Sequence, residues 1–307
     1  MSKPELQLDD PRTILHRYDL WPRKSLGQNF LVDPTAPARI AACADLGPED
    51  TVLEVGAGVG ALTAALAARA GRVIAVETDP QLVEVLHEEL GGLDNVEIVH
   101  GDIMELKPSV LLGIDTLSDE DRGIPLWGPR LPHYRVVSNL PYYITNAVVR
   151  HLLEADVRPA QMVLTVQREV AQRMAAKPGD MSLLSVSVQL YGDVRRCLRL
   201  GRGAFHPVPN VDSAVVRIDV YEDLPISVGD VGLFFEIARA GFAQRRKQLR
   251  NSLSSTLQLD PNRVEAALEA QGIDHRRRAE TLSIEAWGKV YAGLAPLMAQ
   301  PDGGGQA

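Results

Sequence analysis

The tetrapeptide Asn139-Leu140-Pro141-Tyr142 is the segment whose residue types most directly suggest chemistry. The side-chain oxygen of Asn139 and the backbone carbonyl of Leu140 are two hydrogen-bond acceptors, and Pro141 stiffens the turn that carries them. Two such acceptors can hold the hydrogens of the exocyclic N6 amine of adenine, whose lone pair is otherwise delocalised into the ring. After this nitrogen attacks the methyl group of a sulfonium donor, it becomes cationic and sheds its proton readily, so no strong base is required. Positioning and electrostatics would therefore carry the reaction.

Two aromatic residues are candidates to hold such a base. Tyr142 offers a flat face on which a base would gain about 1–3 kcal/mol by stacking, and a base reached in this way must be flipped out of its helix. Phe205, in the segment 205–209 (FHPVP), could close the other face. The alternatives are a turn aromatic for Tyr142 and core packing for Phe205, and His206 is interpreted as a loop residue.

A glycine-rich segment at residues 54–60 (EVGAGVG), where the first strand meets the first helix, predicts a nucleotide-type ligand, because missing side chains let a ligand approach the backbone. The same residues fit G-x-G-x-x-A, so this motif alone does not separate NAD from S-adenosylmethionine. Glu77 is placed to accept hydrogen bonds from ribose hydroxyls, and Asp102 either accepts from the adenine of the cofactor or caps a helix. Since ligands bind at the carboxyl ends of parallel strands, we expect Gly56, Glu77, Asp102 and Asn139 to converge.

The elements that must position these residues alternate between strands and helices, which predicts an α/β fold with a parallel sheet. Short β-branched runs predict strands at 51–56, 72–77, 96–100, 135–138 and 161–166. Helix-like stretches lie at 61–69, 80–90 and 145–154, with Asp79 and Thr145 as N-caps. Two further strand candidates, 183–191 and 213–220, suit an antiparallel hairpin at the edge of the sheet.

The pattern after Tyr221 becomes helical, which predicts two domains. The first is an α/β domain over residues 1–222, with 107–133 as a long loop or insertion. The second is an all-helical domain over residues 223–307, with helical segments around 231–256, 261–271 and 283–298.

The net charge of -8 and the pI of about 5.4 argue mildly against a nucleic-acid partner. The distribution of charge matters more, because three basic runs lie in the second half of the chain. One basic run by itself is typical of a solvated helix face, but three predict a composite basic surface. The runs are Arg239, Arg245, Arg246, Lys247 and Arg250; Arg195, Arg196, Arg199 and Arg202; and Arg276, Arg277 and Arg278.

The cysteine content and the apolar stretches argue against disulfide-rich, metal-binding and membrane-spanning proteins. Cys43 and Cys197 lie far apart in the sequence without His at ligand spacing, which excludes a disulfide framework and predicts no metal site, and both are expected to be small core residues. No run reaches the ~18 apolar residues of a membrane span. With neither a signal nor a transit pattern at the N-terminus, we expect a cytoplasmic protein without membrane contact, and we expect a monomer.

Taken together, these motifs closely resemble the ribosomal RNA adenine dimethyltransferases of the KsgA/RsmA family. The resemblance extends from about Arg23 to Leu253. It is carried by residues 24–31 (KSLGQNFL), the glycine turn, Glu77, Gly101-Asp102, 139–144 (NLPYYI), 205–213 and 244–253 (QRRKQLRNSL).

The resemblance implies a Rossmann-like S-adenosylmethionine-dependent methyltransferase coupled to ribosome biogenesis. Its partner would be the immature small ribosomal subunit, where two adjacent adenines near the 3′ end of 16S RNA each receive two methyls. It implies that Asn139, Leu140, Pro141, Tyr142 and Phe205 form the catalytic site, and that a helix with Arg245, Arg246, Lys247 and Arg250 contacts RNA. It assigns cofactor binding to Gln28, Asn29, Leu31, Gly56, Gly58, Glu77, Thr78, Asp102, Ile103 and Asn139.

Three features depart from the family pattern. Residues 107–133 lengthen the gap before Asn139, the overall charge is acidic, and Asp180-Met181 precedes Ser182 where a more aromatic or basic segment is expected. They bear on the extent of the RNA footprint and leave the catalytic tetrapeptide intact.

Three other functions remain open from the sequence. An Erm-type enzyme shares the catalytic motifs but methylates large-subunit RNA, and the segment 245–247 favours the small subunit. A non-catalytic ribosome-assembly factor is disfavoured by intact Asn139, Pro141 and Tyr142. An NAD-dependent dehydrogenase is disfavoured because no His or Lys lies in comparable motif context.

Overall fold

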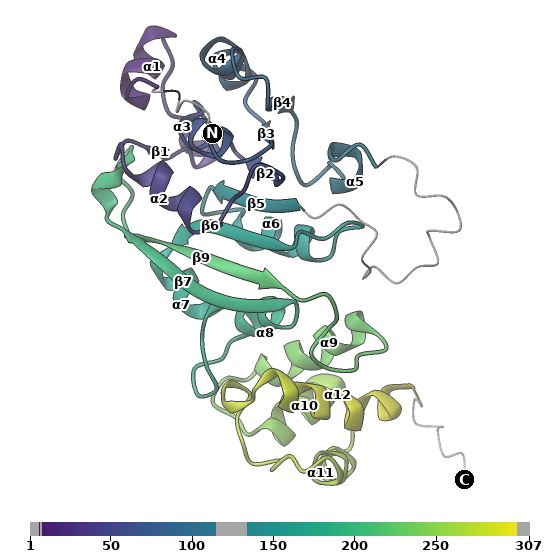
Figure 1. Cartoon of the computed structure of the whole chain (residues 1–307). Helices are drawn as coiled ribbons and strands as arrows, with labels where there is room; N and C mark the ends of the chain where they lie inside the picture. The colour runs from purple at the N-terminus through teal and green to yellow at the C-terminus, as the bar shows by residue number, and fades with distance from the viewer. Residues whose placement is uncertain (1–5, 7, 115–133, 300–307) are drawn as a thin grey trace. The chain divides into compact units, whose positions relative to one another are not determined.

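The computed structural model describes residues 6, 8–114 and 134–299 (Figure 1). Its main feature is a seven-stranded sheet with the strand order β4-β3-β2-β5-β6-β9-β7. A second, two-stranded sheet pairs β1 (Phe30–Leu31) with β8 (Phe205–His206). The strands of the large sheet are β2 (Thr51–Val55), β3 (Arg72–Glu77), β4 (Val96–His100), β5 (Tyr134–Asn139), β6 (Gln161–Gln167), β7 (Gly192–Leu200) and β9 (Ser213–Val220).

The strands β4, β3, β2, β5 and β6 run parallel, as the alternation of strands and helices predicts. β9 pairs antiparallel with β6, with Val163 opposite Arg217, and β7 forms the edge beyond β9. Because parallel strands end at the same edge, the turns after β2, β3, β4 and β5 gather there. The sheet is therefore the Rossmann-like scaffold that the site requires.

The helices that accompany the sheet start where the sequence supplies caps. Asp79 caps α4 (Pro80–Leu90) by accepting a hydrogen bond from the Gln81 N–H at 3.1 Å, as predicted. Thr145 is instead the first residue of α6 (Thr145–Leu153), and its hydroxyl donates to the Pro141 carbonyl. The other helices of this part are α1 (Pro11–Arg17), η1 (Lys24–Leu26), α2 (Ala36–Ala42), α3 (Ala61–Ala67), α5 (Pro108–Leu111), α7 (Arg168–Met174) and η3 (Arg202–Ala204).

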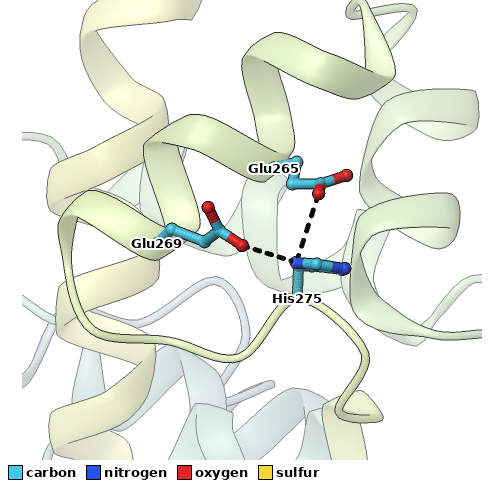
Figure 2. Close-up of side chains that lie close together, drawn as sticks. All are labelled: Glu265, Glu269 and His275. Atoms are coloured by element: carbon cyan, nitrogen blue, oxygen red, sulfur yellow. Dashed lines mark hydrogen bonds and ion pairs between the residues drawn. The ribbon is translucent and has the colours of Figure 1, made fainter.

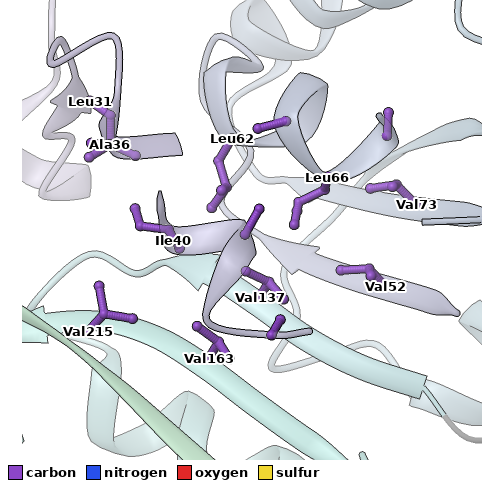
Figure 3. Close-up of a cluster of buried hydrophobic side chains, with 14 of the residues drawn as sticks. Leu31, Ala36, Ile40, Val52, Leu62, Leu66, Val73, Val137, Val163 and Val215 are labelled. Atoms are coloured by element: carbon purple, nitrogen blue, oxygen red, sulfur yellow. The ribbon is translucent and has the colours of Figure 1, made fainter. Parts of the chain in front are cut away.

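A cluster of buried aliphatic side chains joins α2 and α3 to the sheet (Figure 3). Burial of such side chains stabilises the fold by roughly 1.5–3 kcal/mol each. The packing holds the sheet and its covering helices as one scaffold beneath the turns. The residues labelled in Figure 3 are Leu31, Ala36, Ile40, Val52, Leu62, Leu66, Val73, Val137, Val163 and Val215.

Contacts between residues divide the chain into two compact units. Unit 1 comprises Met1–Gln172 and Asp193–Glu222, and unit 2 comprises Arg173–Gly192 and Asp223–Ala307. Residues 173–192 thus group with the second unit, whereas the sequence pattern assigned them to the first domain. The helices of unit 2 are α8 (Leu183–Gln189), α9 (Val231–Phe242), α10 (Leu249–Leu257), α11 (Pro261–Ala270), η4 (Ala279–Thr281) and α12 (Ile284–Ala299).

The predicted strand at 183–191 is wrong, because these residues form α8. Ser182 and Ser185 make reciprocal side-chain to backbone hydrogen bonds, a capping box that starts a helix. The edge next to β9 is formed by β7 instead. This strand was missed because its polar side chains lack the β-branched pattern of a buried strand.

Two other predicted segments differ from the structure. The helix expected at 231–256 is two helices, α9 and α10, and residues 244–247 lie in the turn between them. The expected loop 107–133 begins with the short helix α5, and residues 115–133 of it lie outside the described part of the chain. In that described part, no helix is both long and apolar enough to cross a bilayer.

Candidate functional site

A pocket lies in unit 1 where the turns after β2, β3, β4 and β5 meet the segment 26–31. Gly56, Glu77, Asp102 and Asn139 all line it, as the convergence argument predicts. Every residue to which the sequence assigned cofactor binding lines the same pocket, as do Leu140, Pro141 and Tyr142. The predicted cofactor residues and the tetrapeptide are therefore neighbours in space, whereas Phe205 does not line the pocket.

The glycine turn owes its shape to a backbone conformation that few residues adopt. Gly58 has a φ of +62°, and a Cβ at this position would lie 3.2 Å from the Phe30 ring. Its N–H donates a 2.8 Å hydrogen bond to Oε2 of Glu77. The turn after β2 is thereby fixed against the end of β3, and its backbone is open to a ligand.

Glu77 is a buried carboxylate, 5% exposed, held by backbone donors at the end of β3. Besides Gly58, the N–H groups of Thr78 and Asp79 donate to its Oε1 at 2.9 and 3.0 Å. Burial raises the pKa of Glu77, and these donors oppose that rise by stabilising the charged form. Such a fixed acceptor suits the hydroxyls of a ribose.

Glu54 is a pocket residue that the sequence analysis placed in the glycine-rich segment without giving it a role of its own. Its side chain is 1% exposed, and Oε2 finds no hydrogen-bond partner among the described residues. Desolvation raises the pKa of Glu54 to about 8; the Thr63 hydroxyl acts against this rise, and the nearby charge of Glu77 adds to it. A buried carboxyl with an unpaired oxygen in a pocket fits a cationic ligand. Its place just before Gly56 was the only available signal.

The side chain of Asn139 has a defined orientation. Its Nδ2 donates a 3.0 Å hydrogen bond to the backbone carbonyl of Asn29, and Nδ2 of Asn29 donates to the Gly27 carbonyl at 2.8 Å. Because the amide nitrogen is used in this way, the amide oxygen of Asn139 remains the acceptor that the predicted chemistry needs.

The rest of the tetrapeptide is also held in place. The Pro141 carbonyl already accepts from the Thr145 hydroxyl and the Ile144 N–H, at 3.2 and 3.3 Å, which favours the Leu140 carbonyl as the second acceptor. The half-buried Tyr142 shares a 2.7 Å hydrogen bond between its hydroxyl and that of Ser213. This bond restrains the ring, which lines the pocket.

Phe205 is not brought to the pocket. It is 1% exposed, lies opposite Leu31 in the β1–β8 pair, and belongs to the core cluster under the sheet. The predicted role as the second stacking face is wrong for this structure, which shows the alternative, core packing. The physical reason is that burying a phenyl ring in an aliphatic core is favourable by itself.

The remaining predicted cofactor residues combine structural and ligand-facing positions. Asp102 accepts a 2.9 Å hydrogen bond from the Met104 N–H, so it caps a local turn while it also lines the pocket. Ile103 is buried at 3% exposure and Thr78 is exposed at the rim. Both interpretations of Asp102 from the sequence are thus compatible with its position.

The basic residues 245–247 are exposed and lie in a turn of unit 2, not on a helix as predicted, because α9 ends at Phe242. Arg250 is engaged within the chain, with an ion pair to Glu265 at 3.0 Å and a hydrogen bond to the Pro261 carbonyl at 3.3 Å. We name residues 244–247 the basic turn.

A second basic segment lies beside the basic turn. The carbonyls of Arg277 and His275 accept hydrogen bonds from the N–H groups of Leu249 and Arg250, at 2.7 and 3.1 Å. These bonds seat residues 274–278, which we name the arginine loop, on the first turn of α10. Two of the three predicted basic runs are therefore neighbours within unit 2.

The two cysteines are neighbours in space although they are far apart in the sequence. Cys43 is half-buried and Cys197 is exposed, so the expectation that both are core residues is wrong. Their thiols interact, and the Cys43 thiol lowers the pKa of Cys197 to about 7. Burial and the same contact raise the pKa of Cys43.

Known proteins resemble the chain over nearly its whole length. A family model described as ribosomal RNA adenine dimethylase matches residues 21–295. The ribosomal RNA small subunit methyltransferase A of Dehalococcoides mccartyi (strain CBDB1) is 44% identical over 95% of this chain and 96% of its own length. The protein of the same name from Moorella thermoacetica is 46% identical over 90% of this chain and 94% of its own.

Two solved structures share the fold. The 23S rRNA methyltransferase ErmE is 29% identical with a TM-score of 0.65, over 87% of this chain and 99% of that one. A dimethyladenosine transferase from Plasmodium falciparum has a TM-score of 0.70 at 21% identity, over 87% of this chain and 98% of that one. The latter similarity supports the Rossmann-like methyltransferase fold.

Proposed function

The chain belongs to the ribosomal RNA adenine dimethylase family, and from this premise we propose that it dimethylates the N6 amines of two adjacent adenines near the 3′ end of 16S small-subunit RNA. The methyl donor would be S-adenosylmethionine and the substrate an immature small subunit, so that the reaction is coupled to ribosome biogenesis. The observation that carries the proposal is the orientation of Asn139, whose amide nitrogen is used by Asn29 and whose oxygen is left to accept.

The chain's part in the reaction is to hold the adenine amine and orient its lone pair. The oxygen of Asn139 and the carbonyl of Leu140 would each accept one N6 hydrogen, which favours a pyramidal nitrogen with its lone pair directed outward. The ring of Tyr142, fixed by Ser213, would stack on the base. These groups are preorganised before the substrate arrives, which is the condition for effective electrostatic catalysis.

The pocket fits S-adenosylmethionine, which when bound supplies an electrophilic methyl on a sulfonium. Glu77 would accept from the ribose hydroxyls, and the residues Asp102 and Ile103 would contact the adenine. In its ionised form, Glu54 would favour a ligand that carries positive charge over a dinucleotide with its anionic phosphates.

The small subunit is the favoured substrate because relatives at 44–46% identity are named for it, while ErmE is 29% identical. The exposed basic turn offers phosphate contacts that can offset the net charge of -8. We propose that the chain acts in the cytoplasm as a monomer, with no metal in the methyl transfer.

The first test compares Asn139→Ala with Asn146→Ala, an exposed residue of α6 that serves as the matched control. Turnover at saturating cofactor on immature small subunits should fall by roughly 100-fold or more for Asn139→Ala, as for loss of one preorganised partner at a reacting centre. The control should keep the wild-type rate. Equal rates for the two variants would contradict the proposed role of Asn139.

The second test identifies the substrate. Both ribosomal subunits are incubated with enzyme and cofactor, and methylated adenosines are mapped by mass spectrometry. Two adjacent dimethyladenosines near the 3′ end of 16S RNA are expected. Methylation of large-subunit RNA alone would support an Erm-type activity instead, and binding of small subunits without any methylation would support a non-catalytic assembly factor.

A further inference from the structure

A cluster of two carboxylates and one imidazole lies in unit 2 (Figure 2). Glu265 and Glu269 are one helical turn apart on α11, so their side chains emerge on the same face. His275 reaches them from the arginine loop. One ligand atom from each residue lies within 4.8 Å of the other two.

The distances suit a small tetrahedral ion. Zinc binds imidazole nitrogen and carboxylate oxygen at about 2.0–2.2 Å, so its ligand atoms lie roughly 3.3–3.6 Å from one another. Nδ1 of His275 lies 3.2 Å from Oε1 of Glu269 and 3.8 Å from Oε1 of Glu265. Small side-chain adjustments would bring all three atoms to the distances of a tetrahedral site.

The surroundings hold two of the three ligands in place. Nη1 of Arg250 binds Oε2 of Glu265 at 3.0 Å, which leaves Oε1 directed toward His275. The main chain of His275 is fixed because its carbonyl accepts from the Arg250 N–H. A carboxylate whose second oxygen is hydrogen-bonded is typical of metal centres, where such outer contacts orient the ligand.

The local charges permit a divalent cation. Arg250 is bonded to Glu265, and Arg276, whose charge interacts with that of Glu269, is itself paired with Asp274 at 3.0 Å. Glu269 is exposed, and His275 is partly exposed at 17% of its side chain, so an ion and a water as fourth ligand can reach the site.

We propose that Glu265, Glu269 and His275 form a zinc-type divalent metal site that ties the arginine loop to α11. Nδ1 of His275 would bind the ion through its lone pair, with the ring proton carried on Nε2. The ion does not take part in methyl transfer. Its effect is to fix the loop that carries Arg276, Arg277 and Arg278.

The test uses the full-length protein after removal of metal with a chelator. Zn²⁺ is titrated by calorimetry, and Co²⁺ is titrated as a visible-light probe, because tetrahedral Co²⁺ absorbs far more strongly than octahedral Co²⁺. One saturable site per chain is expected. His275→Asn and Glu269→Gln should each weaken binding at least 10-fold, since each removes one of three ligands.

Two controls separate this site from other metal-binding groups. His87→Asn changes an exposed histidine near Glu84 and Glu88 on α4, and it should leave the affinity unchanged. Replacement of both cysteines by serine should also leave it unchanged. A loss of binding in either control that equals the loss in His275→Asn would overturn the proposal.

A second measurement does not depend on the variants being folded. Hydrogen exchange of the wild-type protein should show slower exchange in residues 271–278 when Zn²⁺ is added. If the wild-type chain binds no Zn²⁺ saturably, or binds it without slowing exchange there, the three side chains form an ion-pair cluster only and the proposal is refuted.

Discussion

Glu54 combines burial, an unpaired oxygen and a position in the pocket, and its replacement by glutamine is the most informative single change. Glutamine keeps the size and shape of the side chain but does not titrate. Since burial raises the pKa of Glu54 to about 8, the folded chain holds a proton that the unfolded chain releases near pH 4.5. Wild-type and Glu54→Gln proteins should therefore differ in how their stability depends on pH.

The sign and size follow from proton linkage. For a carboxyl whose pKa is raised in the folded state, the stabilising contribution is complete below pH 4.5 and is lost as pH rises toward about 8. The loss is about 1.4 kcal/mol per pH unit within that window, and on the order of 5 kcal/mol across it. Relative to wild type, the free energy of unfolding of Glu54→Gln should rise by these amounts with increasing pH.

The assay is urea unfolding of both proteins without cofactor, from pH 5 to pH 8. The quantity compared is the difference between the two free energies of unfolding at each pH, because other titrating groups cancel in it. A difference that stays constant across this range would refute the assignment of a raised pKa to Glu54.

The same group predicts a proton effect on cofactor binding. If a cationic cofactor ionises Glu54, wild-type protein at pH 7 should release close to one proton on binding, and Glu54→Gln should release none from this position. Calorimetry in two buffers of different ionisation enthalpy measures the release. Equal proton release by the two proteins would show that the cofactor does not act on Glu54.

Three further predictions test other parts of the structure. Charge reversal of residues 245–247 should weaken binding to small-subunit particles and flatten its salt dependence, measured as the slope of log affinity against log salt; an unchanged slope would exclude phosphate contacts there. Gly241→Ala should lower the free energy of unfolding by about 1–3 kcal/mol in urea melts, because a Cβ would overlap Trp287; an unchanged midpoint would show that the ring moves aside. Alkylation of Cys197 should reach half its maximal rate near pH 7 in wild type and at higher pH in Cys43→Ala, followed by mass spectrometry; identical profiles would show that the thiols do not interact.

The parallel sheet and the pocket were predictable because both follow from local patterns. The strands β2, β3 and β5 each contain adjacent apolar residues, and β3 and β5 end in Glu77 and Asn139 at the same edge of the sheet. Glu77 and Asn139 could therefore be placed in one site without knowledge of the fold's details.

The predictions were wrong where long-range packing or polar capping determines the local structure. Residues 183–191 contain Val186 and Val188, which favour a strand, but the capping box at Ser182 starts a helix. The interior position of Phe205 depends on its pairing with β1, a partner far away in the sequence. Arg250 was predicted to contact RNA because its ion pair with Glu265, which lies on a different helix, leaves no sign in the local sequence. None of these contacts leaves a local pattern in the sequence.

The hydrogen bond from Asn139 to the carbonyl of Asn29 joins positions 110 residues apart in the sequence. A shortened protein that begins at β2 would retain every strand of the large sheet yet lack the group that orients the amide for which we propose a catalytic role. Minimal versions of this enzyme, or chimaeras that exchange its front segment, must therefore keep residues 27–31 together with the loop after β5.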